Sequence, residues 1–179
     1  MTYSDIIHFW FTELEPTNWF VQNDQIDQTI RERFSEIHDQ ATKQELRSWR
    51  GSALGSLAEI IVLDQFSRNM FRDSDRAYEF DSQAIQLTYL ALDKKFDSEL
   101  TTQQRAFLYM PLMHSEELID HDLAVKLFNQ TGLENNYQYE LQHRDIIQRF
   151  GRYPHRNQVL NRESTSEETA FLTQANSSF

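Results

Sequence analysis

The sequence of 179 residues contains no cysteine, which excludes disulfide bonds, thiolate metal ligands and a cysteine nucleophile. Glycine and proline are scarce, with four and three copies, which argues against an all-β fold full of tight turns. Basic residues are too few to balance the acidic ones, and the formal net charge is −11. This charge disfavours nucleic acid and anionic membranes as partners.

Long apolar runs are also missing, since no stretch approaches the roughly 20 residues needed to cross a bilayer. The first residues, MTYSDIIHFWF, have no basic segment and include Asp5, so they do not fit a signal peptide. With the lack of cysteine, these features lead us to expect a cytoplasmic protein. The length predicts a single domain over residues 1–179 with a substantial core.

Apolar residues recur at helical spacing, and no segment alternates with the period of two that is typical of strands. We therefore predict an all-α fold of antiparallel helix pairs. Ala77 and Ala84 lie seven residues apart on one helix face, as in a tetratricopeptide unit, although no 34-residue period repeats. Pro111 predicts a kink or break in its helix. The expected helix boundaries are Ser4, Asn23 or Asp24, Ser52, the capping boxes Thr101–Gln104 and Thr165–Glu168, and Gly151 as a C-terminal cap.

The stretch Leu57–Phe71, LAEIIVLDQFSRNMF, is predicted to be the central helix because its first half is almost wholly apolar. Its second half interleaves polar and apolar residues. Spacing by four lets Asp64 pair with Arg68 and places Gln65 above Asn69. One interpretation is a buried ion pair with two bridging amides. The other is that Asp64 orients Arg68 to bind a carboxylate or phosphate.

A second polar stretch, MPLMHSEE, follows Pro111 and contains His114 and Glu116. It could form a pocket wall, but a single histidine beside an aromatic core is more often a packing residue. The zinc spacing HExxH is absent, and the sequence leaves the identity of any cofactor unknown.

The third polar stretch, His143–Asn157, reads HRDIIQRFGRYPHRN and has two histidines and four arginines with one acid. Spacing predicts a ladder of Asp145, Arg149 and Arg152. The arginines could simply neutralise the acidic surface and fix the loop after Gly151. Alternatively this corner binds an anion through the side chains His143, Arg149, Arg152, His155, Arg156 and Asn157.

With these stretches in view, the chain resembles the uncharacterised bacterial domain-of-unknown-function family 924, which is described as tetratricopeptide-like. The motifs that carry the resemblance include FWF at 9–11, LDQFSRNMFR at 63–72, LYMPLMHSE at 108–116, HRDIIQRFGRYPHRN at 143–157 and LNREST at 160–165. Ser67, Tyr153 and Asn161 depart from the usual Pro, Phe and Gly. The resemblance implies a tetratricopeptide-like superhelix of antiparallel helix pairs and implies no activity.

Our leading hypothesis is a helical protein that binds a small anionic ligand or a peptide carboxylate in a polar groove. A rival hypothesis is a hydrolase in which His114 or His143 acts as the base and Asp64 or Glu116 orients it. A metal-dependent version would use His114, His143 and His155 with one carboxylate. In the third hypothesis, the polar residues only hold helices together in a structural scaffold. The candidate site residues are Asp64, Gln65, Arg68, Asn69, His114, Glu116, His143, Arg149, Arg152, His155, Arg156 and Asn157.

Overall fold

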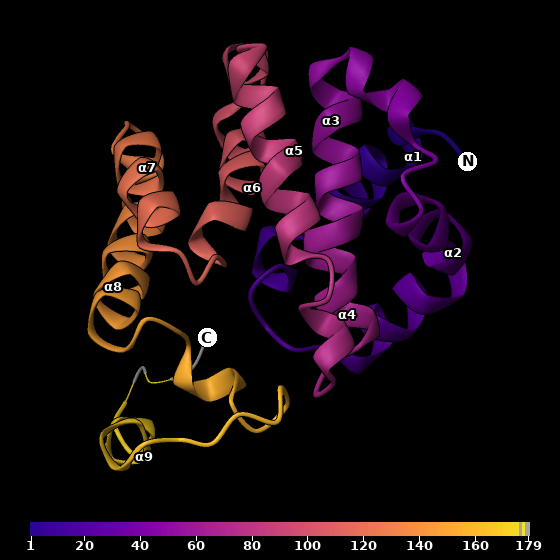
Figure 1. Ribbon diagram of the computed structural model, residues 1–179. Helices are drawn as coiled ribbons and strands as arrows, with labels where there is room; N and C mark the ends of the chain where they lie inside the picture. The colour runs from indigo at the N-terminus through magenta and orange to yellow at the C-terminus, as the bar shows by residue number, and fades with distance from the viewer. Residues whose placement is uncertain (176, 178–179) are drawn as a thin grey trace.

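The computed structural model describes residues 1–175 and 177, and within these residues all regular structure is helical (Figure 1). The prediction of an all-α fold is therefore confirmed. No helix in this described part is long and apolar enough to cross a membrane. The α-helices are α1 (Tyr3–His8), α2 (Asp24–Thr42), α3 (Ala53–Ile61), α4 (Ser67–Met70), α5 (Asp81–Asp93), α6 (Thr102–Met113), α7 (Leu118–Phe128), α8 (Glu134–Phe150) and α9 (Ser166–Leu172).

Shorter helical pieces link or extend these elements. Two are π-helical turns, at Phe9–Glu13 and Val62–Phe66. The others are 3₁₀ turns at Pro16–Asn18, Arg47–Gly51, Asp75–Ala77, Phe96–Glu99 and Pro154–Arg156. Ala77 therefore lies before α5 and not within one long helix with Ala84, as the spacing of the two alanines had suggested.

Most predicted helix boundaries are confirmed. The side chains of Asn23 and Ser52 accept backbone hydrogen bonds at the starts of α2 and α3, and both capping boxes form. Gly151 ends α8 with a φ of 68°, in the left-handed conformation that glycine adopts at least cost. Asn161, which replaces a glycine of the family pattern, has a φ of 53°. Ser4 does not cap α1, because Thr2 occupies that position.

The central stretch is one continuous helical path through α3, the π-helical turn Val62–Phe66 and α4. α3 is buried almost completely, because α1, α5 and α6 all pack against it. Even Glu59 is 0% exposed, and its carboxylate binds the Arg50 guanidinium at 2.6 and 2.7 Å. The ring of Phe66 packs against the rings of Phe9 and Phe34 in the aromatic part of the core. The sequence prediction of a buried central helix is confirmed.

The prediction of a kink or break at Pro111 is wrong as to the break, because α6 continues through this residue to Met113. Proline removes one backbone hydrogen bond and crowds the carbonyl four residues earlier, which favours a break in isolation. In the folded chain Pro111 is buried on a helix that packs against α3, α5 and α7. Tertiary packing can therefore outweigh the local preference.

In Figure 1, α5 and α6 lie between the central helices and the α7–α8 pair. The chain beyond α8 then turns back under the molecule, and Pro154–Arg156 approaches the start of α5 through Arg156 and Asp81. Tyr153, Ile146 and Ile147 form a second small apolar cluster, which Phe171 of α9 joins. This return path brings the arginine-rich segment to the ends of α4, α5 and α6.

Candidate functional site

The candidate site is built around the carboxylate of Asp64, which lies in the π-helical turn and is 1% exposed. Its Oδ1 atom is 2.8 Å from Nδ1 of His114 and 3.0 Å from Nη1 of Arg68. Its other oxygen accepts a hydrogen bond from the Gln65 amide at 2.6 Å. A π-helical turn widens the helix locally and often occurs at functional sites. Here it carries two of the predicted site residues, Asp64 and Gln65, and Arg68 follows in α4.

Arg68 joins this carboxylate to a second one. Its guanidinium binds both oxygens of Asp81, at 2.9 and 3.0 Å, while also lying against Asp64. Burial alone would raise the pKa of Asp64, but the neighbouring Arg68 and His114 bring it well below its ordinary value. Asp64 is therefore ionised at neutral pH. The predicted pairing of Asp64 with Arg68 is confirmed.

Arg156 brings a second buried guanidinium to the cluster from the C-terminal segment. It is 6% exposed and lies between the rings of Tyr78 and Tyr153, at 4.5 and 4.4 Å from their centroids. Its Nη2 donates to the His114 carbonyl at 3.0 Å, and its Nη1 is 3.4 Å from Asp81. Within the described part of the chain, Nε is buried without a hydrogen-bond partner. Arg156 is thus held rigidly but is only loosely paired with a carboxylate.

His114 is the member of the cluster whose protonation matters most for chemistry. Burial lowers its pKa below 6.5 and the nearby Arg68 lowers it further, against the opposing effect of Asp64. The ring is therefore neutral at neutral pH, with the Nδ1 proton directed at Asp64. Nε2 is then a hydrogen-bond acceptor, and it has no partner among the described residues.

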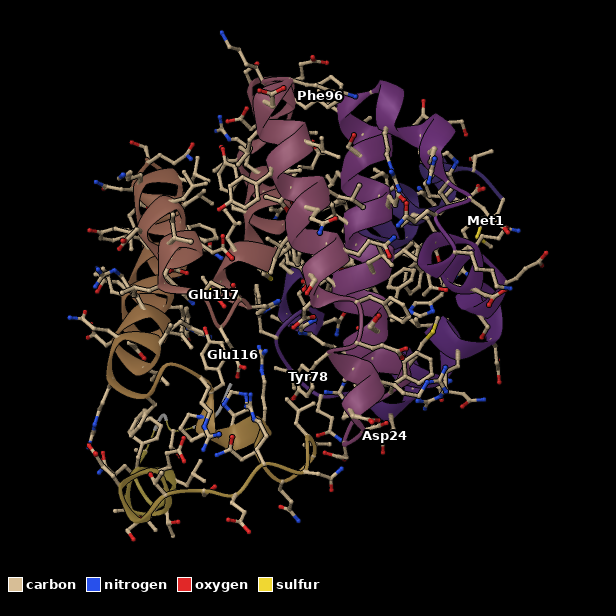
Figure 2. All side chains as sticks on the ribbon, in the orientation of Figure 1. Met1, Asp24, Tyr78, Phe96, Glu116 and Glu117 are labelled. Carbon is tan, nitrogen blue, oxygen red and sulfur yellow. The ribbon has the colours of Figure 1, made fainter. Side chains whose placement is uncertain are left out.

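A cavity of about 720 Å³ opens beside His114 and Arg156. Cavities of this size are typical of small-molecule sites. Figure 2 shows Tyr78 before α5, and Glu116 and Glu117 in the loop before α7. The cavity is lined by Asp75, Arg76, Tyr78, Glu79, Asp81, Ser82, Ile85, Gln86, His114, Ser115, Glu116, Glu117, Asp120, Arg156 and Leu160.

Glu116, also predicted as a site residue, lines the cavity, but its carboxylate is bound to residues of the C-terminal segment. Its carboxylate binds Arg162 at 2.6 and 2.9 Å and accepts the backbone N–H of Tyr153 at 2.8 Å. Burial opposes ionisation, yet these hydrogen bonds hold the pKa of Glu116 below its ordinary value. Asn157, 1% exposed, supports this arrangement by accepting from Arg162 at 3.0 Å. Both residues fix the cavity wall.

Asn69 does not join this site. Its amide donates to Asp27 of α2 at 2.7 Å, and Arg72 binds the same carboxylate at 2.8 and 2.9 Å. The polar residues at the end of the central helix therefore belong to two separate clusters. Arg68 contacts Asp64 and Asp81, whereas Asn69 contacts Asp27. The expected stacking of Asn69 with Gln65 is replaced by a contact to α2.

The predicted ladder of Asp145, Arg149 and Arg152 is wrong. Arg149 binds Glu167 at 2.7 Å, and Arg152 binds Glu168 at 2.6 and 2.8 Å, so both arginines attach α9 to the end of α8. The expectation from spacing could not include these acids, which enter from a later helix. Of the arginines predicted to bind an anion in His143–Asn157, Arg156 lines the cavity, whereas Arg149 and Arg152 bind acids of α9.

His143 and His155 lie behind the cavity, around the buried ring of Tyr153. Their ring centroids are 5.7 and 5.5 Å from that of Tyr153, and His121 lies at 6.2 Å. Burial lowers the pKa of His143 to about 3 and that of His155 to about 4. They are neutral packing residues near the site.

The hypothetical metal site of His114, His143, His155 and one carboxylate does not form. No group of three or more His, Cys, Asp or Glu side chains that could hold a metal ion exists within residues 1–175 and 177. His114 is instead directed to Asp64, and the other two rings pack against Tyr153.

The sequence analysis did not identify three residues that contribute to this site: Tyr78, Asp81 and Arg162. Asp81 is the first residue of α5, where an acid is usually explained by the helix dipole. Arg162 lies beyond the arginine-rich stretch His143–Asn157, and its partner Glu116 is 46 residues earlier in the chain. No local signal relates Asp81 to Arg156, which lies 75 residues later.

The fold and this cluster define an all-helical protein with a polar cavity backed by a buried Asp–His–Arg arrangement. The family model described as "Bacterial protein of unknown function (DUF924)" matches residues 6–176, and the chain belongs to this family. The solved structure of a protein of unknown function, ATU0120 from Agrobacterium tumefaciens, is similar, with 35% sequence identity and a TM-score of 0.91. The match covers 95% of this chain and 96% of that one. No curated protein gave a match.

Proposed function

We propose that this chain binds a small anionic ligand, with a carboxylate or phosphate group, in the cavity beside His114 and Arg156. The observation that carries the proposal is the state of Arg156. The side chain is almost completely buried, its 3.4 Å contact to Asp81 is shared with Arg68, and its Nε has no partner among the described residues. A buried cation without a close counter-ion is costly. An anion in the cavity would supply that counter-ion.

The surroundings of Arg156 support a role in recognition. Two tyrosine rings hold the guanidinium in place, so little side-chain entropy is lost when it forms a new hydrogen bond. A planar guanidinium can bind a carboxylate or phosphate through two parallel hydrogen bonds. Asp64 in turn fixes the His114 ring, whose Nε2 would orient a donor group of the ligand.

Hydrolase activity is a second candidate function, supported by the Asp64–His114 pair. A carboxylate that accepts from Nδ1 keeps the imidazole in the form in which Nε2 can act as a general base. Water would be the nucleophile, because the Ser115 hydroxyl donates to Asp120 at 2.5 Å. The scaffold hypothesis accounts for Arg149 and Arg152, which have exposed or partly exposed ion pairs, but not for the unpartnered Nε of Arg156.

The tetratricopeptide-like superhelix is also kept as a proposal. It is supported by the packing of consecutive helices, since α5 contacts α6, α6 contacts α7 and α7 contacts α8. Stacked helix pairs produce concave surfaces that commonly bind ligands.

The anion proposal can be tested by thermal unfolding in phosphate, acetate and chloride at equal ionic strength. Phosphate or acetate is expected to raise the melting temperature of the wild type above the chloride value, since a ligand of the folded state stabilises it. At 100 times the dissociation constant the gain is about 2.7 kcal/mol. Arg156→Gln should abolish the gain, whereas Arg149→Gln should retain it because Arg149 is bound to Glu167 on the surface.

Two controls make the comparison decisive. Phosphate also stabilises proteins by exclusion from their surface, and this general effect should be equal in all variants. Arg156→Lys keeps the charge and the aliphatic stem, so it separates loss of recognition from loss of folding. An equal anion-specific gain in wild type and Arg156→Gln would contradict the proposal.

A further inference from the structure

We infer that the ligand of this cavity carries an ammonium group as well as its anionic group, and so belongs to the amino-acid or short-peptide class. The inference rests on the proposed anion site at Arg156 and adds a second charge to the ligand. It is carried by the distribution of paired and unpaired charges around the cavity.

The acids of the inner cavity wall already have partners. Asp81 binds Arg68 and Arg156, and Glu116 binds Arg162. Asp120 accepts hydrogen bonds from the hydroxyls of Tyr89 and Ser115 at 2.5 Å each. The carboxylates of Asp81 and Glu116 are therefore paired with guanidinium groups, and the buried Nε of Arg156 has no hydrogen-bond partner among the described residues.

The outer rim is different. Asp75, Glu79 and Glu117 line the cavity, are exposed, and form no ion pair with any described residue. The rim cation Arg76 stacks on Phe71, with its guanidinium 3.8 Å from the ring centroid. Three unpaired carboxylates against one guanidinium leave the rim negative. A purely anionic ligand would be repelled there, whereas an ammonium group would be attracted.

The inner wall favours a ligand with an N–H group close to its anionic group. Neutral His114 presents Nε2 as an acceptor, and Arg156 donates to the backbone carbonyl of that same histidine. A ligand that offers a hydrogen-bond donor beside an acceptor therefore fits this point better than one with acceptors alone. A bare carboxylate or phosphate dianion offers only acceptors, but a peptide or amino acid offers N–H groups close to its carboxylate.

The orientation follows from this arrangement. The carboxylate lies toward Arg156, an N–H group faces Nε2 of His114, and the ammonium points toward the rim carboxylates. Figure 2 shows Glu117 in the loop before α7 and Tyr78 in the segment before α5. These two segments carry the rim carboxylates, which therefore lie on both sides of the cavity. A volume of about 720 Å³ has room for a dipeptide.

Three related probes separate the two charges: alanyl-alanine, its N-acetylated form without an ammonium group, and its C-terminal amide without a carboxylate. Dissociation constants are measured by NMR chemical-shift titration of the full-length chain at neutral pH and low salt. Alanyl-alanine is expected to bind about fivefold more tightly than its acetylated form, from exposed charge pairs. The amide should bind most weakly, because it cannot engage Arg156 as an anion.

The double variant Glu79→Gln with Glu117→Gln should reduce the preference for the free amine to about one. Both side chains are exposed, so the variant should fold, which its melting temperature checks. Glu32→Gln with Glu36→Gln is the matched control, since it makes the same charge change on exposed positions of α2 outside the cavity lining. This control should keep the fivefold preference.

The outcomes distinguish this inference from the proposal beneath it. Equal affinity for the free and acetylated dipeptides, or an unchanged preference in the double variant, would overturn the zwitterionic ligand and leave the anion site. Failure of every peptide to bind, with phosphate still stabilising the wild type through Arg156, would do the same. Absence of any response to phosphate, acetate or peptide would remove both.

Discussion

Nδ1 of His114, at the C-terminal end of α6, lies 2.8 Å from the carboxylate of Asp64 in the π-helical turn. The contact joins two segments 50 residues apart and leaves Nε2 as the acceptor nitrogen of the neutral ring. It also makes Asp64 the point at which His114, Arg68 and Gln65 are held together. The properties of the cavity should therefore depend on this one carboxylate.

Asp64→Ala is expected to destabilise the protein by about 3–5 kcal/mol, because it leaves Arg68 and His114 buried without their shared partner. Glu32→Ala removes an exposed acid on α2 and should cost no more than about 1 kcal/mol. Matched urea or thermal unfolding of the two variants measures the difference. Similar losses in both would show that Asp64 does not hold the cluster together.

Ser67→Ala is expected to cost about 1–3 kcal/mol. The Ser67 hydroxyl is 0% exposed, donates to the Leu63 carbonyl at 2.6 Å and contacts Nε2 of His38 at 2.8 Å. Its removal leaves both groups short of a partner beside the π-helical turn. Ser35→Ala is the matched control, since Ser35 is exposed and also donates to the carbonyl four residues earlier, that of Arg31. Equal stability of the two variants would refute this role.

Folding stability is expected to fall as the pH drops below about 6.5. Burial lowers the pKa of His38 to about 4, of His143 to about 3 and of His155 to about 4. The unfolded chain therefore binds more protons than the folded one between about pH 4 and 6.5. Stability is complete above the unfolded pKa and is lost toward the folded values, with a limiting slope of about 1.4 kcal/mol per pH unit for each histidine.

Urea unfolding across this pH range checks the expectation. His155→Phe keeps a ring beside Tyr153 and removes one titrating group, so its stability should fall less steeply with decreasing pH. His8→Phe is the control, because the His8 side chain is 63% exposed and its replacement should leave the slope unchanged. A parallel slope for His155→Phe and the wild type would exclude His155 as a source of acid sensitivity.

Local signals determined the helical elements. Asn23 and Ser52 cap their helices, and Gly151 ends another, because capping depends on residues within one turn of the chain. The burial of α3 follows from its nearly continuous apolar sequence. These features need no knowledge of the neighbouring helices, so the sequence alone was sufficient for them.

Charged contacts were only partly determined by the sequence, and two pairs with the same spacing show why. Asp64 and Arg68 lie four residues apart and do pair, at 3.0 Å. Asp145 and Arg149 have the same spacing, but Glu167 of α9 takes Arg149 at 2.7 Å. Helical spacing only makes a contact possible. Whether it forms depends on which other charges the fold brings within reach.

The cavity itself was decided by tertiary structure. Asp81 meets Arg156 from 75 positions away, and Asn69 is drawn to Asp27 across 42 positions. A charged side chain pairs with an opposite charge that lies close to it in space. The packing of α5, α6 and the returning C-terminal segment sets the distance between Arg156 and Asp81. The sequence alone therefore indicated that Arg156 and His114 are candidates, and only the folded chain placed them on one cavity.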